Sequence, residues 1–177
     1  LVLELMLKVM RFIMGLQKLK MKIQFSLNGK KITDEIAVDM PLLEYLREKG
    51  CYSVKRGCET SNCGLCTVLM DGKPVLSCTT LAVRANGKEI FTLEGLQKEA
   101  EEFGSFLADQ GADQCGFCNP GFIVNVIAMT KELQQPDEQE IKEYLEGNLC
   151  RCTGYQGHLR AVQSYLQAKQ AEGGSHE

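Results

Sequence analysis

The sequence predicts an α+β protein in which a β-rich half is followed by an all-α half, with the junction near residue 95. Between Lys22 and Ile36, apolar and polar residues alternate around an Asn28-Gly29 pair, as in a β-hairpin with a two-residue turn. After Glu94-Gly95, apolar residues recur every three or four positions instead, which is the spacing of one face of an amphipathic helix. This change of period predicts two halves with different secondary structure.

The first half is expected to hold short strands and one short helix. Two strands within residues 22–36 precede a helix that begins at Pro41, because proline is favoured in a first helical turn. Residues 53–66 are read as a polar loop that carries cysteines. Three further strands are expected at residues 67–70, 74–76 and 90–93. The result is a small mixed sheet wrapped on one helix.

The second half is expected to hold four helices. The first two are marked by apolar stripes around Phe103 and between Phe122 and Leu133. Asp137 followed by Glu140 forms a capping-box pattern that begins the third helix. A last stripe, from Ala161 to Leu166, marks the fourth helix. We therefore divide the chain into an extension (1–20), a first domain (21–95), a second domain (96–170) and a frayed tail (171–177).

Residues 1–20 are apolar but are interrupted by charges such as Glu4, Lys8 and Arg11. The stretch has no clean apolar run near the roughly 20 residues that a membrane-spanning helix needs, and it lacks the parts of a secretory signal. We interpret it as an upstream extension of the first domain. A helix that docks on a partner subunit and an interfacial membrane helix are the alternatives. No membrane span is expected, and a cytoplasmic location is predicted.

The amino-acid composition of the chain excludes some classes of function. The chain has 177 residues, of which 44% are apolar and 24% charged, as in ordinary globular proteins. A net charge of −3 gives no basic excess for phosphates, so we expect no nucleic-acid partner. The outlier is nine cysteines, an odd number that a purely internal set of disulfides cannot use up.

The first cysteine set is spaced as in plant-type ferredoxins, with C-x4-C-x2-C followed by a fourth cysteine. A 2Fe–2S cluster needs four thiolates, two for each iron. A zinc site is the alternative, but zinc ribbons use paired C-x2-C knuckles and only one such pair is present. A disulfide framework is disfavoured because no secretion signal precedes it. The members are Cys58, Cys63, Cys66 and Cys78.

The second cysteine set joins a C-x2-C pair to a C-x-C pair: Cys115, Cys118, Cys150 and Cys152. Asn119-Pro120 is expected to supply the N-cap and first residue of a helix, which places Cys118 where the helix dipole favours an anionic cluster. Taken alone, this set fits zinc as well as iron–sulfur. Taken with the first set, iron–sulfur is favoured.

The motifs around both sets resemble those of the molybdenum hydroxylase family, which includes xanthine dehydrogenases, aldehyde oxidoreductases and carbon monoxide dehydrogenases. The resemblance covers about residues 21–170, and Cys51 matches no ligand position. It implies a β-grasp, ferredoxin-like 2Fe–2S domain followed by a four-helix-bundle 2Fe–2S domain. The matching segments are Gly57–Cys66 with Cys78, Gln114–Gly121 and Gly147–Tyr155.

The resemblance also implies a role and partners. The chain is similar to the separate iron–sulfur subunit that carries electrons from a molybdopterin on a large partner subunit, through two 2Fe–2S clusters, to FAD on a medium subunit or to another acceptor. Gln114 is implied to contact the pterin, and Cys152 to be the ligand nearest to it. No catalytic residue is expected in this chain, because the substrate chemistry takes place on a partner.

The sequence leaves the substrate open. Ser53 to Cys58 resembles purine-oxidising members, and relatives that oxidise aldehydes, N-heteroaromatics or carbon monoxide are the alternatives. A free-standing ferredoxin and a zinc-stabilised interaction module are the rivals from other classes. Of the remaining residues, His158 is expected on the surface or at an interface, and Cys51 as a small buried or half-buried thiol.

Overall fold

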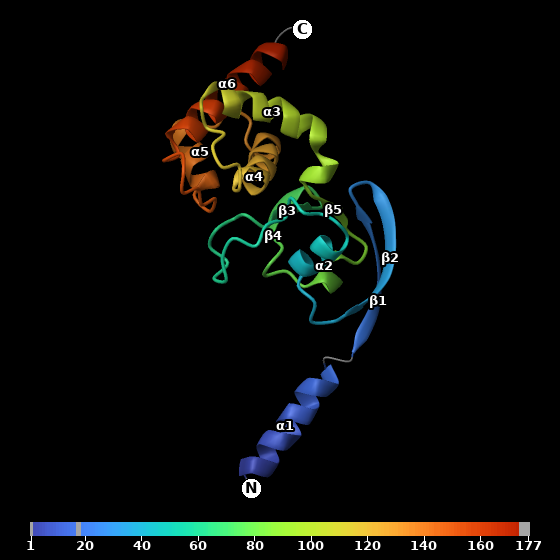
Figure 1. Cartoon of the computed structure of the whole chain (residues 1–177). Coiled ribbons are helices and arrows are strands. Elements are labelled where there is room, and N and C mark those ends of the chain that lie inside the picture. The colour runs from blue at the N-terminus through green and yellow to red at the C-terminus, as the bar shows by residue number, and fades with distance from the viewer. Residues whose placement is uncertain (1, 17–18, 174–177) are drawn as a thin grey trace.

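The computed structural model describes residues 2–16 and 19–173 and confirms an α+β fold (Figure 1). The strands are β1 (Lys20–Leu27), β2 (Lys30–Ala37), β3 (Thr67–Met70), β4 (Lys73–Leu76) and β5 (Glu89–Phe91). The helices are α1 (Val2–Leu16), α2 (Leu42–Glu48), α3 (Gln97–Asp109), α4 (Asn119–Glu132), α5 (Glu138–Leu145) and α6 (Gln156–Gly173), with short 3-10 turns at Ala82–Ala85 and Leu93–Gly95.

The five strands form one mixed sheet with the order β2-β1-β5-β3-β4. β5 is parallel to β1 and antiparallel to β3, and the other neighbours are antiparallel. The β1–β2 hairpin turns at Asn28 and Gly29, whose φ angles of 51° and 77° are those that a type I′ turn requires. Helix α2 buries its apolar face in the same core as Ile23, Phe25 and Ile90 of the sheet.

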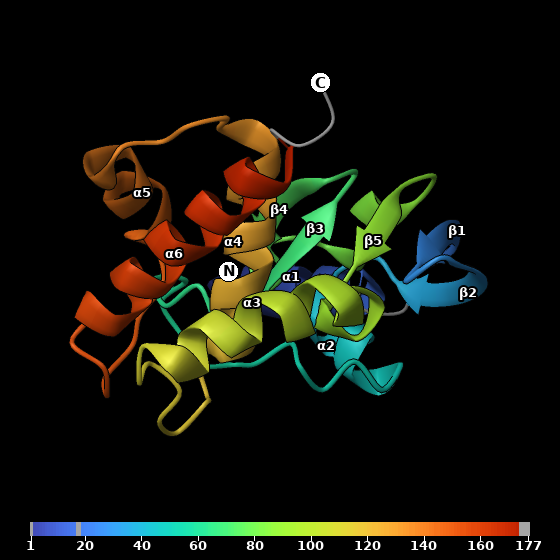
Figure 2. The ribbon, with the colours of Figure 1, turned by 90° about the horizontal axis from the view of Figure 1, so that it is seen from above.

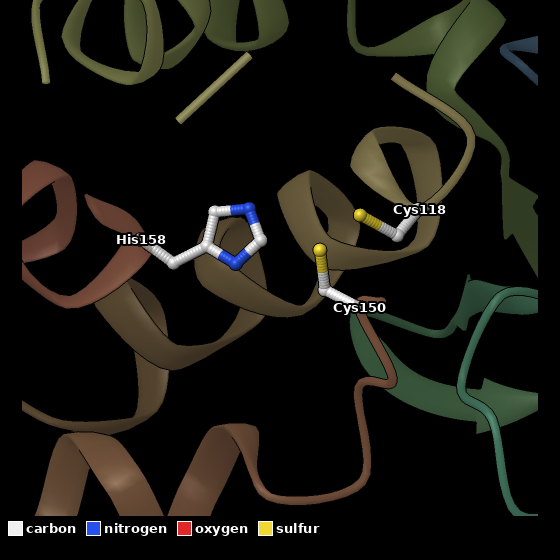
Figure 3. Close-up of side chains that lie close together, drawn as sticks. All are labelled: Cys118, Cys150 and His158. Carbon is white, nitrogen blue, oxygen red and sulfur yellow. The ribbon is translucent and has the colours of Figure 1, made fainter. Parts of the chain in front are cut away.

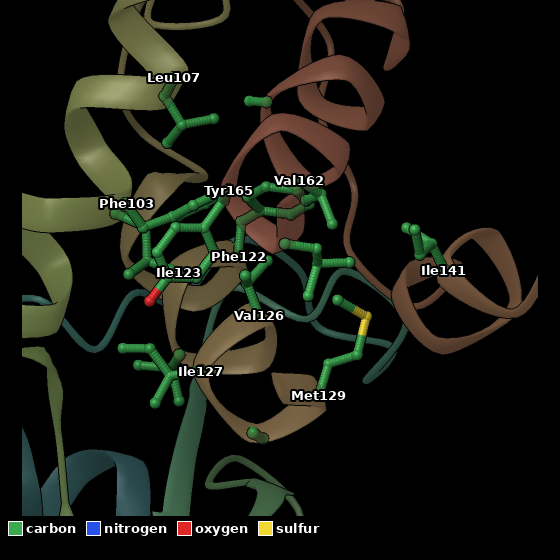
Figure 4. Close-up of a cluster of buried hydrophobic side chains, with 14 of the residues drawn as sticks. Phe103, Leu107, Phe122, Ile123, Val126, Ile127, Met129, Ile141, Val162 and Tyr165 are labelled. Atoms are coloured by element: carbon green, nitrogen blue, oxygen red, sulfur yellow. The ribbon is translucent and has the colours of Figure 1, made fainter. Parts of the chain in front are cut away.

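Helices α3 to α6 form the second half around a separate core (Figure 4). Phe103 of α3 packs against Phe122 of α4 and Tyr165 of α6, with ring centroids 6.1 and 5.2 Å apart. The core also takes in Leu69 of β3, because α4 lies against β3 and β4 (Figure 2). One strand of the sheet therefore helps to fill the interior of the helical half.

Helix boundaries follow the sequence with small differences. The capping box is confirmed, since Asp137 and Glu140 each accept a hydrogen bond from the other's backbone N–H. The N-cap of α4 is Cys118, whereas Asn119 was expected there. The Asn119 amide instead donates to Asp113 Oδ1 at 2.9 Å, so it serves the preceding loop. Helix α6 continues to Gly173 into the predicted tail, and residues 174–177 lie outside the described chain.

Helix α1 occupies most of the predicted extension. Figure 1 shows it leading away from the two halves, and its described side chains, such as Leu3 and Leu5, are exposed. Across residues 2–16 and 19–173, no helix is long and apolar enough to cross a membrane. The role of residues 1–20 and the predicted domain boundaries stay predictions.

Candidate iron–sulfur sites

The first site, here called the ferredoxin-type site, is built on the loop that leads into β3 and on Cys78, the second residue after β4. The thiol of Cys58 interacts with that of Cys63, and the thiol of Cys66 interacts with that of Cys78. Cys63 and Cys66 are buried, and Cys58 and Cys78 are half-buried. The four sulfurs thus approach in two pairs, which is what two irons with two thiolates each require.

Backbone amides of this loop converge on the sulfurs. Hydrogen bonds from Cys63 and from the backbone N–H groups of Thr60 and Asn62 lower the pKa of Cys58 to about 6. In contrast, burial raises the pKa of Cys66 to about 11. Because only thiolates bind iron, loading this site must release the protons of its thiols. The amide donors then offset the negative charge that stays on the bound sulfurs.

The second site, here called the helical site, lies where the loop before α4 meets the loop between α5 and α6. The Sγ atoms of Cys115 and Cys152 lie 3.5 Å apart, and both residues are exposed. The other pair, Cys118 and Cys150, lies further inside (Figure 3). Burial and the neighbouring Cys150 raise the pKa of Cys118 to about 12. The site therefore has an exposed pair and an inner pair.

The spacing of the sulfurs distinguishes iron–sulfur from zinc. Four thiolates on one tetrahedral Zn²⁺, with bonds of about 2.3 Å, have sulfurs only about 3.8 Å from one another. Within the described chain, no three cysteine sulfurs lie within 4.8 Å of one another. The two-by-two arrangement of thiols at both sites therefore fits a two-iron cluster better than a single zinc ion held by four thiolates. The donor set of four thiols per site fits the same group.

His158 corrects an expectation from the sequence. It is 3% exposed, not at the surface, and its ring stacks on Phe122 with centroids 4.4 Å apart. One of its ring nitrogens lies within 4.8 Å of the Cys118 and Cys150 sulfurs (Figure 3). Burial lowers the pKa of its imidazole, which favours the neutral form of the ring. The sequence held a signal for this, since His158 precedes Ala161 and Val162 by three and four residues and shares their buried face.

Thr153 lies in the matching segment Gly147–Tyr155, but the sequence assigns it no role. Its Oγ1 lies 3.2 Å from Cys150 Sγ and 3.4 Å from His158 Nδ1. It directly follows Cys152, but sequence spacing alone does not show which sulfur its hydroxyl meets.

The two sites meet through their backbones. The N–H of Leu149, next to Cys150, donates to the carbonyl oxygen of Cys63 at 2.9 Å. Gly64, with φ of 71°, lies so close to the other half that an added Cβ would come within 2.4 Å of the Gly147 oxygen. An added Cβ on Gly121 in α4 would come within 2.5 Å of the Gly64 oxygen. Only glycine allows this approach at either position.

The predicted cofactor contact Gln114 is exposed, next to the exposed Cys115. Three large apolar side chains that lie near these cysteines in the sequence are exposed: Phe117 (49% exposed), Leu149 (54%) and Tyr155 (44%). Cys51 is buried, as expected, and its Sγ lies 3.9 Å from the amide nitrogen of Asn28, in the core of the first half.

Comparison with known domain families gives two matches that together span both sites. Residues 25–92 match the "2Fe-2S iron-sulfur cluster binding domain", and residues 92–163 match the "[2Fe-2S] binding domain".

Relatives of similar length are found among bacterial enzymes. The chain is 47% identical over 147 residues to the xanthine dehydrogenase iron-sulfur-binding subunit of Escherichia coli O157:H7, covering 79% of this chain and 91% of that one. It is 40% identical to the nicotinate dehydrogenase small FeS subunit of Eubacterium barkeri, covering 77% and 88%. The crystal structure of quinoline 2-oxidoreductase from Pseudomonas putida 86 holds a chain with 37% identity and a TM-score of 0.77, covering 86% of this chain and 97% of that one.

Proposed function

The chain belongs to the family of iron–sulfur subunits of molybdenum hydroxylases, and we propose that electrons enter it at the helical site and leave it from the ferredoxin-type site. The electrons come from a molybdopterin centre on a large partner subunit. They pass to FAD on a medium subunit or to another acceptor. Each 2Fe–2S cluster, when bound, accepts and releases one electron. The chain itself positions the clusters, shields them from water and sets their reduction potentials.

The observation that carries this proposal is the direct backbone link between the sites. The Leu149 N–H to Cys63 carbonyl hydrogen bond joins a segment of the helical site to a segment of the ferredoxin-type site. Gly64 and Gly121 keep the two segments close, because neither carries a Cβ that would separate them. A short, bonded route between two redox centres favours fast transfer between them.

The proposed direction follows from exposure. Cys115 and Cys152 are exposed, whereas Cys118 and Cys150 lie inward. A partner's cofactor therefore has access to the helical site at its exposed pair. The exposed apolar side chains near these cysteines in the sequence, Phe117, Leu149 and Tyr155, suit a lasting subunit contact.

We assign all eight cysteines as ligands, four to each site. Cys58, Cys63, Cys66 and Cys78 hold the first cluster, and Cys115, Cys118, Cys150 and Cys152 hold the second. Gln114 contacts the pterin, and Cys152 is the ligand nearest to it. We place the chain in the cytoplasm, where thiols that must bind iron stay reduced.

We propose an N-heterocycle, such as a purine, as the substrate of the complex. Two relatives carry the names of such substrates, one as a xanthine dehydrogenase subunit and one as a nicotinate dehydrogenase subunit. Aldehydes and carbon monoxide remain the alternatives, because the substrate pocket lies on a partner chain.

The test is Cys63→Ser, with Cys51→Ser as the matched control. The wild-type chain should hold about four irons and show two distinct signals in electron paramagnetic resonance (EPR) on reduction. Cys63→Ser should lose the ferredoxin-type signal and block transfer to the acceptor, while substrate still reduces the helical cluster in the reconstituted complex. Cys51→Ser should keep both signals. If substrate no longer reduced the helical cluster in Cys63→Ser, although the EPR signal of that cluster was intact, the proposed order of the two sites would be reversed.

A further inference from the structure

A buried histidine stands behind the helical site and is joined to one of its cysteines by a threonine hydroxyl. Thr153 Oγ1 lies 3.2 Å from Cys150 Sγ and 3.4 Å from His158 Nδ1. The backbone N–H of Tyr155 also donates to Thr153 Oγ1, at 3.2 Å. Three groups therefore meet one hydroxyl, which has a single hydrogen and two lone pairs.

The chemistry of the three neighbours fixes the direction of each hydrogen bond. The Tyr155 N–H can only donate, so it takes one lone pair of the hydroxyl. A cysteine that binds iron is a thiolate and can only accept, so it takes the hydroxyl hydrogen. The remaining lone pair then faces His158 Nδ1, which fits there only as an N–H donor. The bonds run from His158 to Thr153 and from Thr153 to Cys150.

The surroundings of the imidazole support the same tautomer. Its Nε2 is buried and has no hydrogen-bonding partner among the described residues. A neutral imidazole carries one N–H, and placing it on Nε2 would bury an unpaired donor. Stacking on Phe122, with an angle of 23° between the rings, fixes the orientation of the imidazole ring. Placing the hydrogen on Nδ1 therefore gives the single N–H of the ring a partner, the threonine hydroxyl.

We propose that Thr153 and His158 are positioning residues that raise the reduction potential of the cluster bound at the helical site. This rests on the proposed function in one respect, the assignment of Cys150 as a cluster ligand. A hydrogen bond to a cluster sulfur stabilises the reduced state more, because that state carries one more negative charge. Thr153 donates this bond, and His158 keeps the hydroxyl hydrogen turned toward sulfur. No proton changes place when the electron arrives.

The test is a redox titration of the purified chain with both clusters bound, followed by EPR. Thr153→Val removes the hydroxyl and keeps a side chain of similar shape, whereas Thr153→Ser keeps the hydroxyl. We expect Thr153→Val to shift the one-electron equilibrium of the helical cluster about tenfold toward its oxidised form, which equals 59 mV. Thr153→Ser should stay at the wild-type value. The ferredoxin-type cluster in the same sample is the internal control.

A second pair of variants tests the part played by His158. His158→Leu should lower the potential of the helical cluster, and His158→Asn, whose amide N–H lies near the position of Nδ1, should restore it. Because His158 acts through Thr153, adding His158→Leu to Thr153→Val should cause no further shift. If Thr153→Val loses its iron, the comparison of His158→Leu with His158→Asn decides the question.

Three results would overturn the inference: an unshifted helical potential in Thr153→Val with both clusters bound, additive shifts in the double variant, or the strong nitrogen hyperfine coupling of a ligating His158. A wild-type chain that binds no cluster would overturn the proposed function as well. Two intact clusters, with a helical-cluster potential that Thr153→Val leaves unchanged, would overturn this inference and leave the proposed function standing.

Discussion

At the scale of single residues, the surroundings of the nine cysteines separate eight of them from the ninth. Each of the eight has another cysteine beside it, in the pairs described above. Cys51 instead lies in an apolar core beside Asn28, and burial raises the pKa of its thiol. A buried neutral thiol of this kind behaves as a small apolar side chain.

Gln114 is the residue through which the chain is expected to reach its partner's cofactor. An amide offers both a donor and an acceptor, which suits the mixed edge of a pterin. Gln114→Ala should leave both clusters intact and weaken binding to the large subunit by about 1–3 kcal/mol, the cost of an unsatisfied buried group. The measurement is the affinity of the loaded chain for the large subunit, with stopped-flow reduction of the helical cluster by substrate.

Gln97→Ala, in the first turn of α3, is the matched loss of an exposed amide. It should change neither affinity nor rate. Wild-type affinity and rate in Gln114→Ala would leave that residue only a local role in its loop.

At the scale of elements, the carboxylate of Glu94 holds the segment between the two halves in place through hydrogen bonds. Glu94 accepts hydrogen bonds from the backbone N–H and the hydroxyl of Ser53, at 2.8 and 2.6 Å, and from the hydroxyl of Thr92. Glu94 is exposed overall, and the partial removal of its carboxylate from water would by itself raise its pKa, but these hydrogen bonds hold the pKa below its ordinary value of 4.5. Glu94 thereby ties the loop after α2 to the start of the helical half.

The sign of this shift gives a pH dependence. A carboxyl whose pKa is depressed on folding adds stability that is fully present above its unfolded pKa and is lost as pH falls through the folded value. We therefore expect Glu94→Gln to lower the melting temperature at pH 7, with the difference from wild type shrinking once pH falls below about 4.5. Calorimetry from pH 7 to pH 3 measures it, with the exposed Glu101→Gln as control. A difference that grows as pH falls would contradict the assignment.

The sequence predicts most helices and strands because the residues that mark them are close together in the chain. The Asn28-Gly29 turn and the Asp137–Glu140 capping box each depend on a few adjacent residues, and both are confirmed. The N-cap of α4 shifted by one residue because Asn119 bonds to Asp113, a choice that depends on the fold of the preceding loop. The link between Cys63 and Leu149 joins residues far apart in the chain, and no local pattern marks it.

At the scale of the whole molecule, the halves are held together by apolar packing and by close backbone contact. Leu69 of the sheet lies in the core of the helical half. Nearby, Gly121 of α4 meets the backbone of Gly64 and Leu65. The distance between the two cluster sites is therefore set by how closely these backbones approach.

Gly121→Ala tests this directly. The added methyl group would come within 2.5 Å of the Gly64 oxygen, so the ligand loop must move away from α4. We expect weaker magnetic coupling between the two reduced clusters in EPR, with both signals retained, and slower transfer between them.

The matched control is Gly147→Ala, in the same region, because a Cβ there would meet nothing within 4 Å. It should keep the wild-type coupling. Equal coupling in both variants would show that the glycine contact does not set the separation of the sites.

The hydrogen bond between Leu149 and Cys63 also has a consequence for how the chain is made. On the ribosome, the ferredoxin-type loop emerges early, and the strands around it are complete well before Leu149 is synthesised. Until then, the Cys63 carbonyl lacks its partner, and Gly64 lacks the backbone of Gly147 against which it rests. We therefore expect the loop to reach its final packing only after residues 147–149 have been synthesised. The final packing of the ferredoxin-type loop is thus coupled to the segment that carries Cys150 and Cys152, although the two segments are far apart in the chain.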